Sequence, residues 1–212
     1  MNKMNKYGYR GRRRVIIDSS IHTLKIEEDS AIMKTAVIGI GNLLYQDEGM
    51  GIHAVNALGV RYGFPPECEI IDGGTKGLEL LPIIEEQDAI ILVDAVDFGK
   101  EAGFIKVIAD QDIKAYLDLK FSVHQIGIPD MLFAMEFKGI KPPKICLIGI
   151  QPPPEEFEME PRLTPVIAGK LTELVETIVV RLRAWGVKVE TRKPEDYSEL
   201  PMEYRNVSGD PF

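Results

Sequence analysis

The fold is decided by residues 35–51, which read TAVIGIGNLLYQDEGMG. The apolar run from Thr35 to Ile40 is short and rich in β-branched residues, and it ends in Gly41-Asn42. This pattern is typical of a buried strand that leads into a tight turn. The stretch then closes with Asp47 and Glu48 among glycines, directly ahead of a helical pattern. A strand, a polar loop and a helix in this order predict the first unit of an α/β domain.

Further apolar runs have the same character and predict further strands, at residues 69–71, 89–93 and 144–150. Near-continuous Ile and Val indicates strands that are covered on both faces, as parallel strands in α/β proteins are. The run at residues 103–108 alternates more between apolar and polar residues. It therefore predicts an antiparallel or edge strand.

Helical patterns separate these strands, at residues 52–58, 78–84, 131–135 and 164–185. Pro82 is expected to shorten or bend the second helix. In the last helix Thr164 is the expected N-cap, Pro165 stands in the first turn, and Gly186 follows the apolar stripe that ends at Trp185. Strands that alternate with helices predict a three-layer α/β/α fold.

The chain has 212 residues, of which 45% are hydrophobic, and this suits one sizeable domain. We assign residues 34–186 to the α/β domain, residues 1–33 to a basic N-terminal extension and residues 187–212 to a polar C-terminal tail. Within the extension, residues 15–17 and 24–26 could form short strands. The extension could touch RNA, an acidic partner or a membrane face, or form a solvated tail.

The bulk properties exclude several classes of protein. A formal net charge of −8 argues against a nucleic-acid-binding protein. Every apolar run is shorter than the roughly 20 residues that cross a bilayer, so no membrane span is expected. No signal peptide pattern opens the chain. Cys68 and Cys146 are too few for a disulfide framework and adjoin β-branched runs, so we expect two core residues in a cytoplasmic protein.

Ligands of open α/β sheets bind beyond the carboxyl ends of the strands, and this rule selects the candidate site residues. Asp94 directly follows the apolar run 89–93. A buried carboxylate needs an ionic partner, hydrogen bonds or a metal, although a capping role at a loop start is an equal alternative. Of Asp47 and Glu48, one can cap the following helix while the other points into the crevice.

His124 stands in a loop ahead of a helix, where a surface role is the usual one, and it becomes a candidate because it falls at the same edge of the sheet as Glu48 and Asp94. His22 lies in the extension, and His53 lies inside the first helix, where a packed or solvent-facing role is expected. Two carboxylates and one imidazole suit borderline divalent metals and leave coordination positions open. Glu48, Asp94 and His124 therefore form a candidate metal site.

Other chemistries have weaker support. The glycines at residues 39–51 lack the third glycine of a dinucleotide fingerprint, and no Lys follows as in a P-loop. The chain has no Gly-x-Ser-x-Gly elbow and no His-Glu-x-x-His helix motif. The residues by themselves indicate an α/β protein with a candidate metal site.

Five segments in order resemble the maturation endopeptidases of nickel–iron hydrogenases. They are residues 39–51, 72–75, 93–95, 124–127 and 147–152, and the resemblance spans roughly residues 34–186. It implies a mixed, mostly parallel five-stranded sheet. It also implies an enzyme that cuts a carboxyl-terminal extension from the hydrogenase large-subunit precursor after nickel insertion.

The resemblance also implies roles for particular residues. The metal-contacting and catalytic positions fall on Glu48, Asp94 and His124. Asp72, followed by Gly73, Gly74 and Thr75, would orient the site or contact the substrate. We expect the metal to be nickel supplied by the substrate, with no organic cofactor, and we expect a monomer. A non-cleaving nickel-checkpoint chaperone and a generic metallo-aminopeptidase are the alternative functions.

Overall fold

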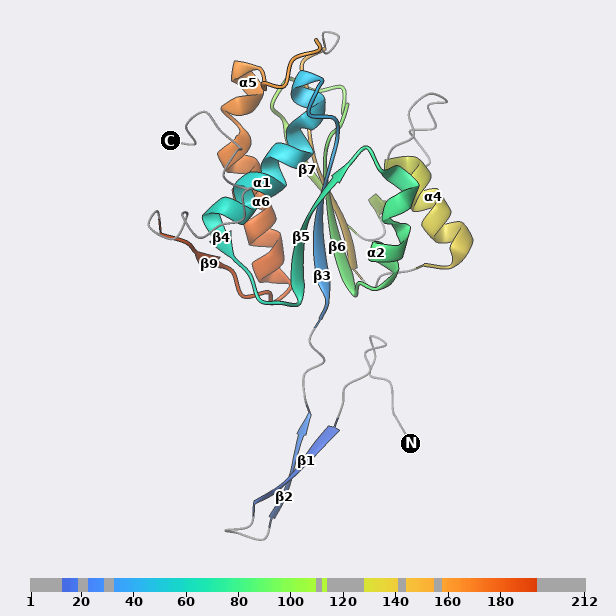
Figure 1. Cartoon of the computed structure of the whole chain (residues 1–212), viewed down its shortest axis with the longest axis vertical. Coiled ribbons are helices and arrows are strands. Elements are labelled where there is room, and N and C mark those ends of the chain that lie inside the picture. Colours follow the sequence, from blue (N-terminus) through green and yellow to red (C-terminus); the bar gives the residue numbers. More distant parts are fainter. Residues whose placement is uncertain are drawn as a thin grey trace.

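The computed structural model describes residues 13–18, 23–28, 33–109, 112–113, 128–140, 144–154 and 158–193. A five-stranded sheet lies at its centre (Figure 1), and the strand order is β5-β3-β6-β8-β7. The first four strands in this order are parallel, and β7 pairs antiparallel with β8 at the edge. The mixed sheet and the antiparallel edge strand are thus confirmed. The strands are β3 (Thr35–Ile40), β5 (Cys68–Gly74), β6 (Ala89–Ala95), β7 (Ile105–Ala109) and β8 (Lys144–Ile150).

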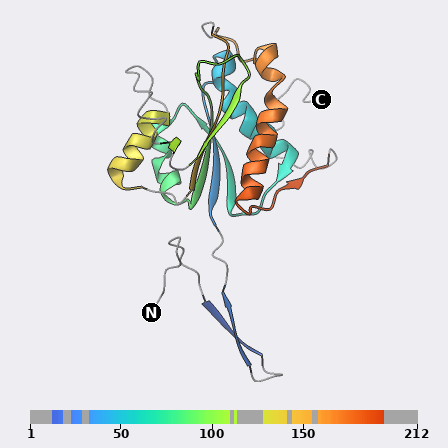
Figure 2. The same ribbon diagram turned by 180° about the vertical axis from the view of Figure 1, so that it is seen from behind.

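Helices cover both faces of this sheet, which confirms the three-layer fold. Figure 1 shows the sheet nearly edge-on with α1 and α6 on one side and α2 and α4 on the other, and Figure 2 shows the same layers from behind. Pro82 stands in the first turn of α2, directly after a 3-10 helix, and so keeps this helix short. The helices of the two layers are α1 (Met50–Arg61) and α6 (Leu171–Ala184), then η2 (Gly77–Leu80), α2 (Leu81–Glu85) and α4 (Ile128–Lys138).

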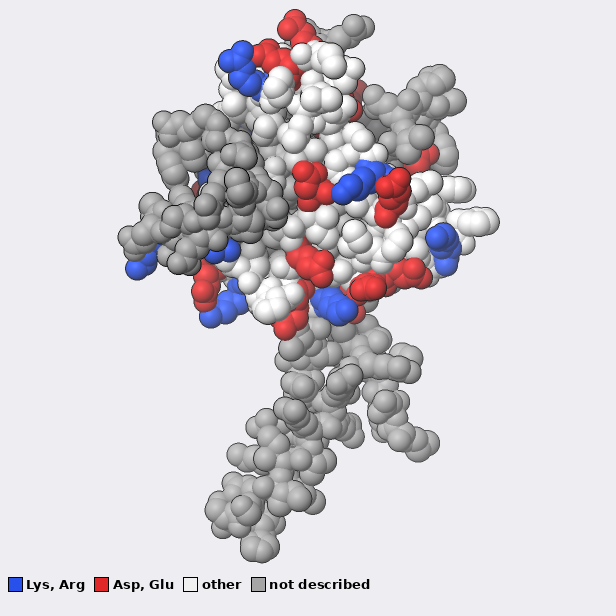
Figure 3. All heavy atoms as spheres, in the orientation of Figure 1, with Lys and Arg blue, Asp and Glu red and all other residues white. Residues whose placement is uncertain are grey.

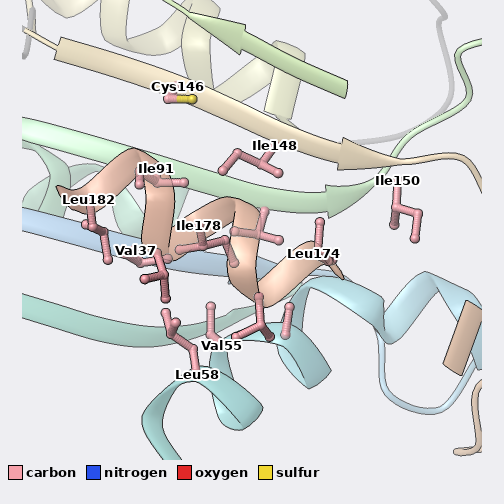
Figure 4. Packing of buried hydrophobic residues seen from close by; sticks show 14 of the residues in the cluster. Val37, Val55, Leu58, Ile91, Cys146, Ile148, Ile150, Leu174, Ile178 and Leu182 are labelled. Atoms are coloured by element: carbon pink, nitrogen blue, oxygen red, sulfur yellow. The ribbon is translucent and has the colours of Figure 1, made fainter. Parts of the chain in front are cut away.

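Alternate residues of each central strand enter two separate cores, because successive side chains of a strand point to opposite faces. Val37 of β3 packs with Val55 of α1 and Ile178 of α6 in the cluster that Figure 4 shows. Its neighbour Ile38 belongs to the second cluster, which contains Ile84 of α2. Each such fully buried side chain contributes about 1.5–3 kcal/mol. Burial on both faces explains why the strand runs are continuously apolar.

Both cysteines lie in the first of these cores. Cys146 is fully buried and Cys68 is 7% exposed, and the two do not form a disulfide. Burial, with a smaller contribution from Glu69, raises the pKa of Cys68 to about 12. The prediction that the cysteines are core residues is confirmed.

This burial predicts that neither thiol reacts with Ellman's reagent in the native protein at pH 8. The thiolate is the reactive species, and a pKa of about 12 leaves almost none of it at Cys68. In guanidinium chloride we expect two equivalents to react at once. Rapid reaction of one equivalent in buffer would contradict the packing described here.

The continuous helix predicted for residues 164–185 is wrong, because the structure divides it into two. Helix α5 (Pro165–Ala168) ends at Gly169, and α6 begins at Leu171. At the break the amide of Lys170 donates to the carbonyl of Ile167, three residues back, instead of four. Glycine weakens a helix by about 1 kcal/mol relative to alanine, which explains where the break falls.

Two further pairs of short strands each form a two-stranded sheet. Strands β1 (Arg13–Asp18) and β2 (Thr23–Glu28) pair antiparallel, which confirms the short strands predicted there. Strand β4 (Tyr62–Gly63) pairs with β9 (Glu190–Thr191), and Val189 is buried in the first core. Packing therefore continues beyond Gly186 into the predicted tail.

Within the described residues, no helix has the length and apolar character that a membrane crossing requires.

Candidate active site

Close backbone packing places the start of α1 across the ends of two neighbouring strands. A Cβ atom on Gly51 would overlap the carbonyl oxygens of Val93 and Ile40, so only glycine allows this approach. The 3-10 helix η1 (Gln46–Gly49) immediately precedes α1 and carries Glu48. Asp94 directly follows Val93 at the end of β6. The packing of α1 on β3 and β6 thus brings Glu48 and Asp94 to the same edge of the sheet.

The environments of these two carboxylates both oppose ionisation. Burial raises the pKa of Asp94 well above its ordinary value, and the nearby charge of Glu48 raises it further. The hydrogen bond of 2.8 Å from the Ala95 amide to Asp94 Oδ1 acts in the opposite direction. Burial also raises the pKa of Glu48, which is half-buried. Paired carboxylates with raised pKa values are typical of catalytic and metal-binding sites.

Within the part of the chain that is described, no lysine or arginine forms an ion pair with either carboxylate. The ion pairs there involve Glu160, Glu173 and Glu190 instead. Two close carboxylates that no described cationic side chain pairs with fit the preference of a divalent cation for oxygen ligands. The pair can therefore hold a metal ion or share a proton.

The third predicted ligand, His124, lies outside the described residues. Among the residues that are described, no three His, Cys, Asp or Glu side chains gather in a group that could hold a metal. The structure brings Glu48 and Asp94 together, and the three-residue site with His124 stays a prediction.

Asp72 lies at the end of β5, on the far side of β3 from Asp94. It is exposed, and its Oδ1 accepts a hydrogen bond of 2.9 Å from the amide of Gly74. The pairing of β3 with β5 shifts at this point, so that Gly73 is an extra residue. A Cβ atom on Gly73 would lie 2.8 Å from Ile38 Cγ2, which excludes larger residues. Asp72 and the exposed Thr75 therefore form a turn beside the site, and their contact with substrate stays a prediction.

Asp47 does not cap the following helix, contrary to one alternative from the sequence. Gly49 is the N-cap of α1, and no side chain caps it. Asp47 is 1% exposed, and its two carboxylate oxygens accept hydrogen bonds from the amide and the hydroxyl of Thr164. No sequence pattern indicated this pairing, because the two residues are 117 positions apart.

Gln151 has a structural role that its sequence motif did not reveal. Its side chain is buried at the end of β8, where Oε1 accepts hydrogen bonds from the amides of Phe98 and Lys100. Its Nε2 donates to Asp97 Oδ1 and to the carbonyl of Pro152. Gln151 thus holds the loop that follows Asp94 against the neighbouring strand.

His53 of α1 has the packed environment that was one of its two expected roles. The residue is half-buried, and its Nε2 atom has no hydrogen-bond partner among the described residues. Burial lowers the pKa of His53, while the charge of Asp47 raises it. The imidazole therefore lies near the carboxylate of Asp47.

The model of the hydrogenase maturation protease family matches residues 52–181, a span that includes Asp94 and His124. The chain belongs to this family. It is therefore a peptidase of hydrogenase maturation, and the resemblance noted in the sequence is confirmed.

Individual hydrogenase maturation proteins support this assignment. The hydrogenase expression/formation protein HupD of Rhizobium leguminosarum bv. viciae is 40% identical over 167 residues, 78% of this chain and 82% of that protein. The hydrogenase 2 maturation protease of Escherichia coli K12 is 37% identical over 162 residues, 76% of this chain and 98% of that protein. The solved structure of the hydrogenase maturating endopeptidase HybD from E. coli superimposes with a TM-score of 0.68 at 36% identity, covering 76% of this chain and 98% of that one.

Proposed function

We propose that this maturation protease removes the carboxyl-terminal extension of a nickel–iron hydrogenase large-subunit precursor, and that Glu48, Asp94 and His124 recognise nickel already inserted in that precursor. The observation that carries the proposal is the pair of carboxylates, Glu48 and Asp94, at the carboxyl edge of the sheet. Both have raised pKa values. Nickel enters this scheme as part of the substrate, and no organic cofactor is needed.

The electrostatics of the pair provide a physical basis for discriminating between precursors. When the site is empty, the charge of Glu48 opposes ionisation of Asp94. A nickel ion carried by the precursor removes this repulsion, so the loaded precursor gains binding energy that the nickel-free precursor lacks. A divalent ion also polarises a nearby carbonyl as a Lewis acid. Glu48 or Asp94 can then accept the proton of the attacking water, since raised pKa values suit a general base.

The proposal also covers the kind of partner, the oligomeric state and the cellular compartment. Figure 3 shows Lys and Arg interspersed with Asp and Glu on one face of the described surface. A mixed surface of this kind favours a protein partner over a nucleic acid, because nucleic-acid binding depends on concentrated positive charge. We further propose that the enzyme acts as a monomer in the cytoplasm, where its buried thiols stay reduced.

The experiment compares nickel-loaded with nickel-free precursor, and intact-mass spectrometry detects the loss of the extension. We expect the wild-type protein to process only loaded precursor and Glu48→Gln, Asp94→Asn and His124→Ala to be severely impaired. Equal processing of both precursors would contradict recognition of nickel. A stable complex without a change of mass would indicate a checkpoint chaperone, and cleavage of generic peptides with added zinc would indicate an aminopeptidase.

The raised pKa values also predict that the protein binds free Ni²⁺ more tightly as the pH rises. A carboxylate must lose its proton before it binds a metal, so protons compete with nickel until the pH exceeds the pKa. For Asp94 this range lies above the ordinary value of 3.8. We expect affinity, measured by titration calorimetry from pH 5 to 7.5, to increase in the wild-type protein. Asp94→Asn should bind weakly at every pH, and a flat wild-type profile would contradict the prediction.

A further inference from the structure

Four hydrogen bonds join the loop that carries Glu48 to a distant segment, residues 158–164, and we call them the clasp. The amide of Thr164 donates to Asp47 Oδ1, and its hydroxyl donates to Asp47 Oδ2, each at 2.8 Å. The amide of Gln46 donates to the carbonyl of Glu160 at 2.7 Å. The amide of Glu158 donates to Gln46 Oε1 at 3.2 Å. Both residues that immediately precede Glu48 are therefore anchored to the same segment.

The backbone at the clasp is strained in a way that needs this anchoring. Gln46 has a φ angle of 35°, and it is the non-glycine residue with positive φ among those described. Residues with a Cβ atom adopt this region at an energetic cost, and they keep it only where surrounding contacts hold them. The two hydrogen bonds of Gln46 to residues 158 and 160 are contacts of this kind.

Thr164 bonds to Asp47 instead of capping the helix that follows it. It occupies the N-cap position of α5 in an extended conformation, yet its side chain makes no capping hydrogen bond. A threonine in this position ordinarily accepts a hydrogen bond from the helix amides. Here the hydroxyl donates to Asp47 instead. The two donors of Thr164, its amide and its hydroxyl, match the two acceptor oxygens of the Asp47 carboxylate. An asparagine at position 47 could accept only one of these hydrogen bonds in this geometry, because its side-chain nitrogen is a donor.

The position of Glu48 depends on its backbone. Its amide donates to the carbonyl of Tyr45 at 2.9 Å, and its carbonyl accepts from the amide of Asn42 at 3.3 Å. Both bonds stay within the same loop, so neither of them ties Glu48 to another part of the chain. The adjacent Asp47 supplies that connection through Thr164.

We infer that Asp47 and Thr164 are positioning residues, which hold the loop so that Glu48 faces Asp94 in the productive geometry. This inference rests on the proposed function of Glu48. A catalytic group that is misplaced by about 1 Å can lose up to a hundredfold in rate, so a loosened clasp should lower kcat.

Thr164→Val tests this inference, because valine has nearly the same shape and removes the hydroxyl. Thr164→Ser keeps both donors. Thr177→Val on α6 is the matched control, since the Thr177 hydroxyl also makes a hydrogen bond of 2.8 Å, to the carbonyl of Glu173. Asp47→Asn is a second disruption of the clasp. For each variant, kcat on nickel-loaded precursor, Tm and hydrogen–deuterium exchange of residues 42–50 are measured.

We expect Thr164→Val and Asp47→Asn to lower kcat roughly tenfold and to speed amide exchange in residues 42–50. In Thr164→Ser, kcat and the exchange rate should lie within twofold of wild type. In Thr177→Val, kcat and the exchange rate should be unchanged, even if its Tm falls as far as that of Thr164→Val. Wild-type kcat and exchange in Thr164→Val, or equal impairment by Thr177→Val, would overturn the inference. Failure of the wild-type protein to process loaded precursor would instead overturn the proposed function.

Discussion

Replacing Asp94 with asparagine should abolish precursor processing and at the same time stabilise the folded protein at neutral pH. Burial and the charge of Glu48 both disfavour the ionised form of Asp94. Asparagine has nearly the same shape, carries no charge and still offers an oxygen to the Ala95 amide. We expect processing to fall at least a hundredfold, because the general base or metal ligand is lost. We expect the free energy of unfolding to rise on the order of 1 kcal/mol, or about 2–4 °C in Tm.

The sign of this effect follows from linkage. A carboxyl group whose pKa is raised on folding favours the folded state fully only below its unfolded pKa, and this stability is lost as the pH rises toward the folded pKa. Asp94→Asn should therefore match the wild-type protein in acid and exceed it increasingly toward neutral pH. Thermal unfolding at pH 4, 5.5 and 7 measures the difference. Glu176→Gln on the exposed face of α6 is the single-charge control, and a lower Tm for Asp94→Asn at pH 7 would contradict the prediction.

Replacing Gly51 with alanine should destabilise the protein by roughly 2–3 kcal/mol, which corresponds to about 5–10 °C in Tm. The added Cβ would overlap the carbonyl oxygens of Val93 and Ile40, which belong to two central strands and cannot move aside like a flexible side chain. At an ordinary helix position the same change stabilises by up to 1 kcal/mol, so the sign of the effect is diagnostic. Because α1 must move away from the strand ends, precursor processing should fall as well.

Gly63→Ala provides the matched control for this prediction. Its added Cβ would meet nothing closer than Arg192 Cζ and the carbonyl oxygen of Glu190, each at 4.0 Å. We expect its unfolding free energy, from urea denaturation, to stay within about 0.5 kcal/mol of wild type. Similar losses in the two variants would show that the close approach of α1 to the sheet does not explain the requirement for glycine at position 51.

Sequence patterns predicted the central fold because its strands are buried on both faces. The runs at residues 36–40, 89–93 and 145–150 contain no polar residue, so the strand pattern is uninterrupted. The division between α5 and α6 was missed because a helical apolar stripe continues across Gly169. The pairing of β4 with β9 was missed because two residues are too few to form a periodic pattern.

The sequence predicted the part of the candidate site that depends on the order of the strands. Glu48 and Asp94 come after neighbouring parallel strands, so the strand-end rule places them together. The pairing of Asp47 with Thr164 follows no such rule. The sequence offered each residue a local role as a helix cap. In the folded protein the two side chains instead form hydrogen bonds with each other, across 117 positions of the chain.

The link between Asp47 and Thr164 also sets the order of events when the protein is made. Thr164 follows Asp47 by 117 residues, and at about 5–20 residues per second the ribosome needs on the order of ten seconds to add them. Once Asp94 has been added, the nascent chain contains the acidic pair, but the loop of Glu48 still lacks its anchor. Processing competence would then arise in one late step, so that an unfinished protease chain carries the acidic pair without the geometry to cut a hydrogenase precursor.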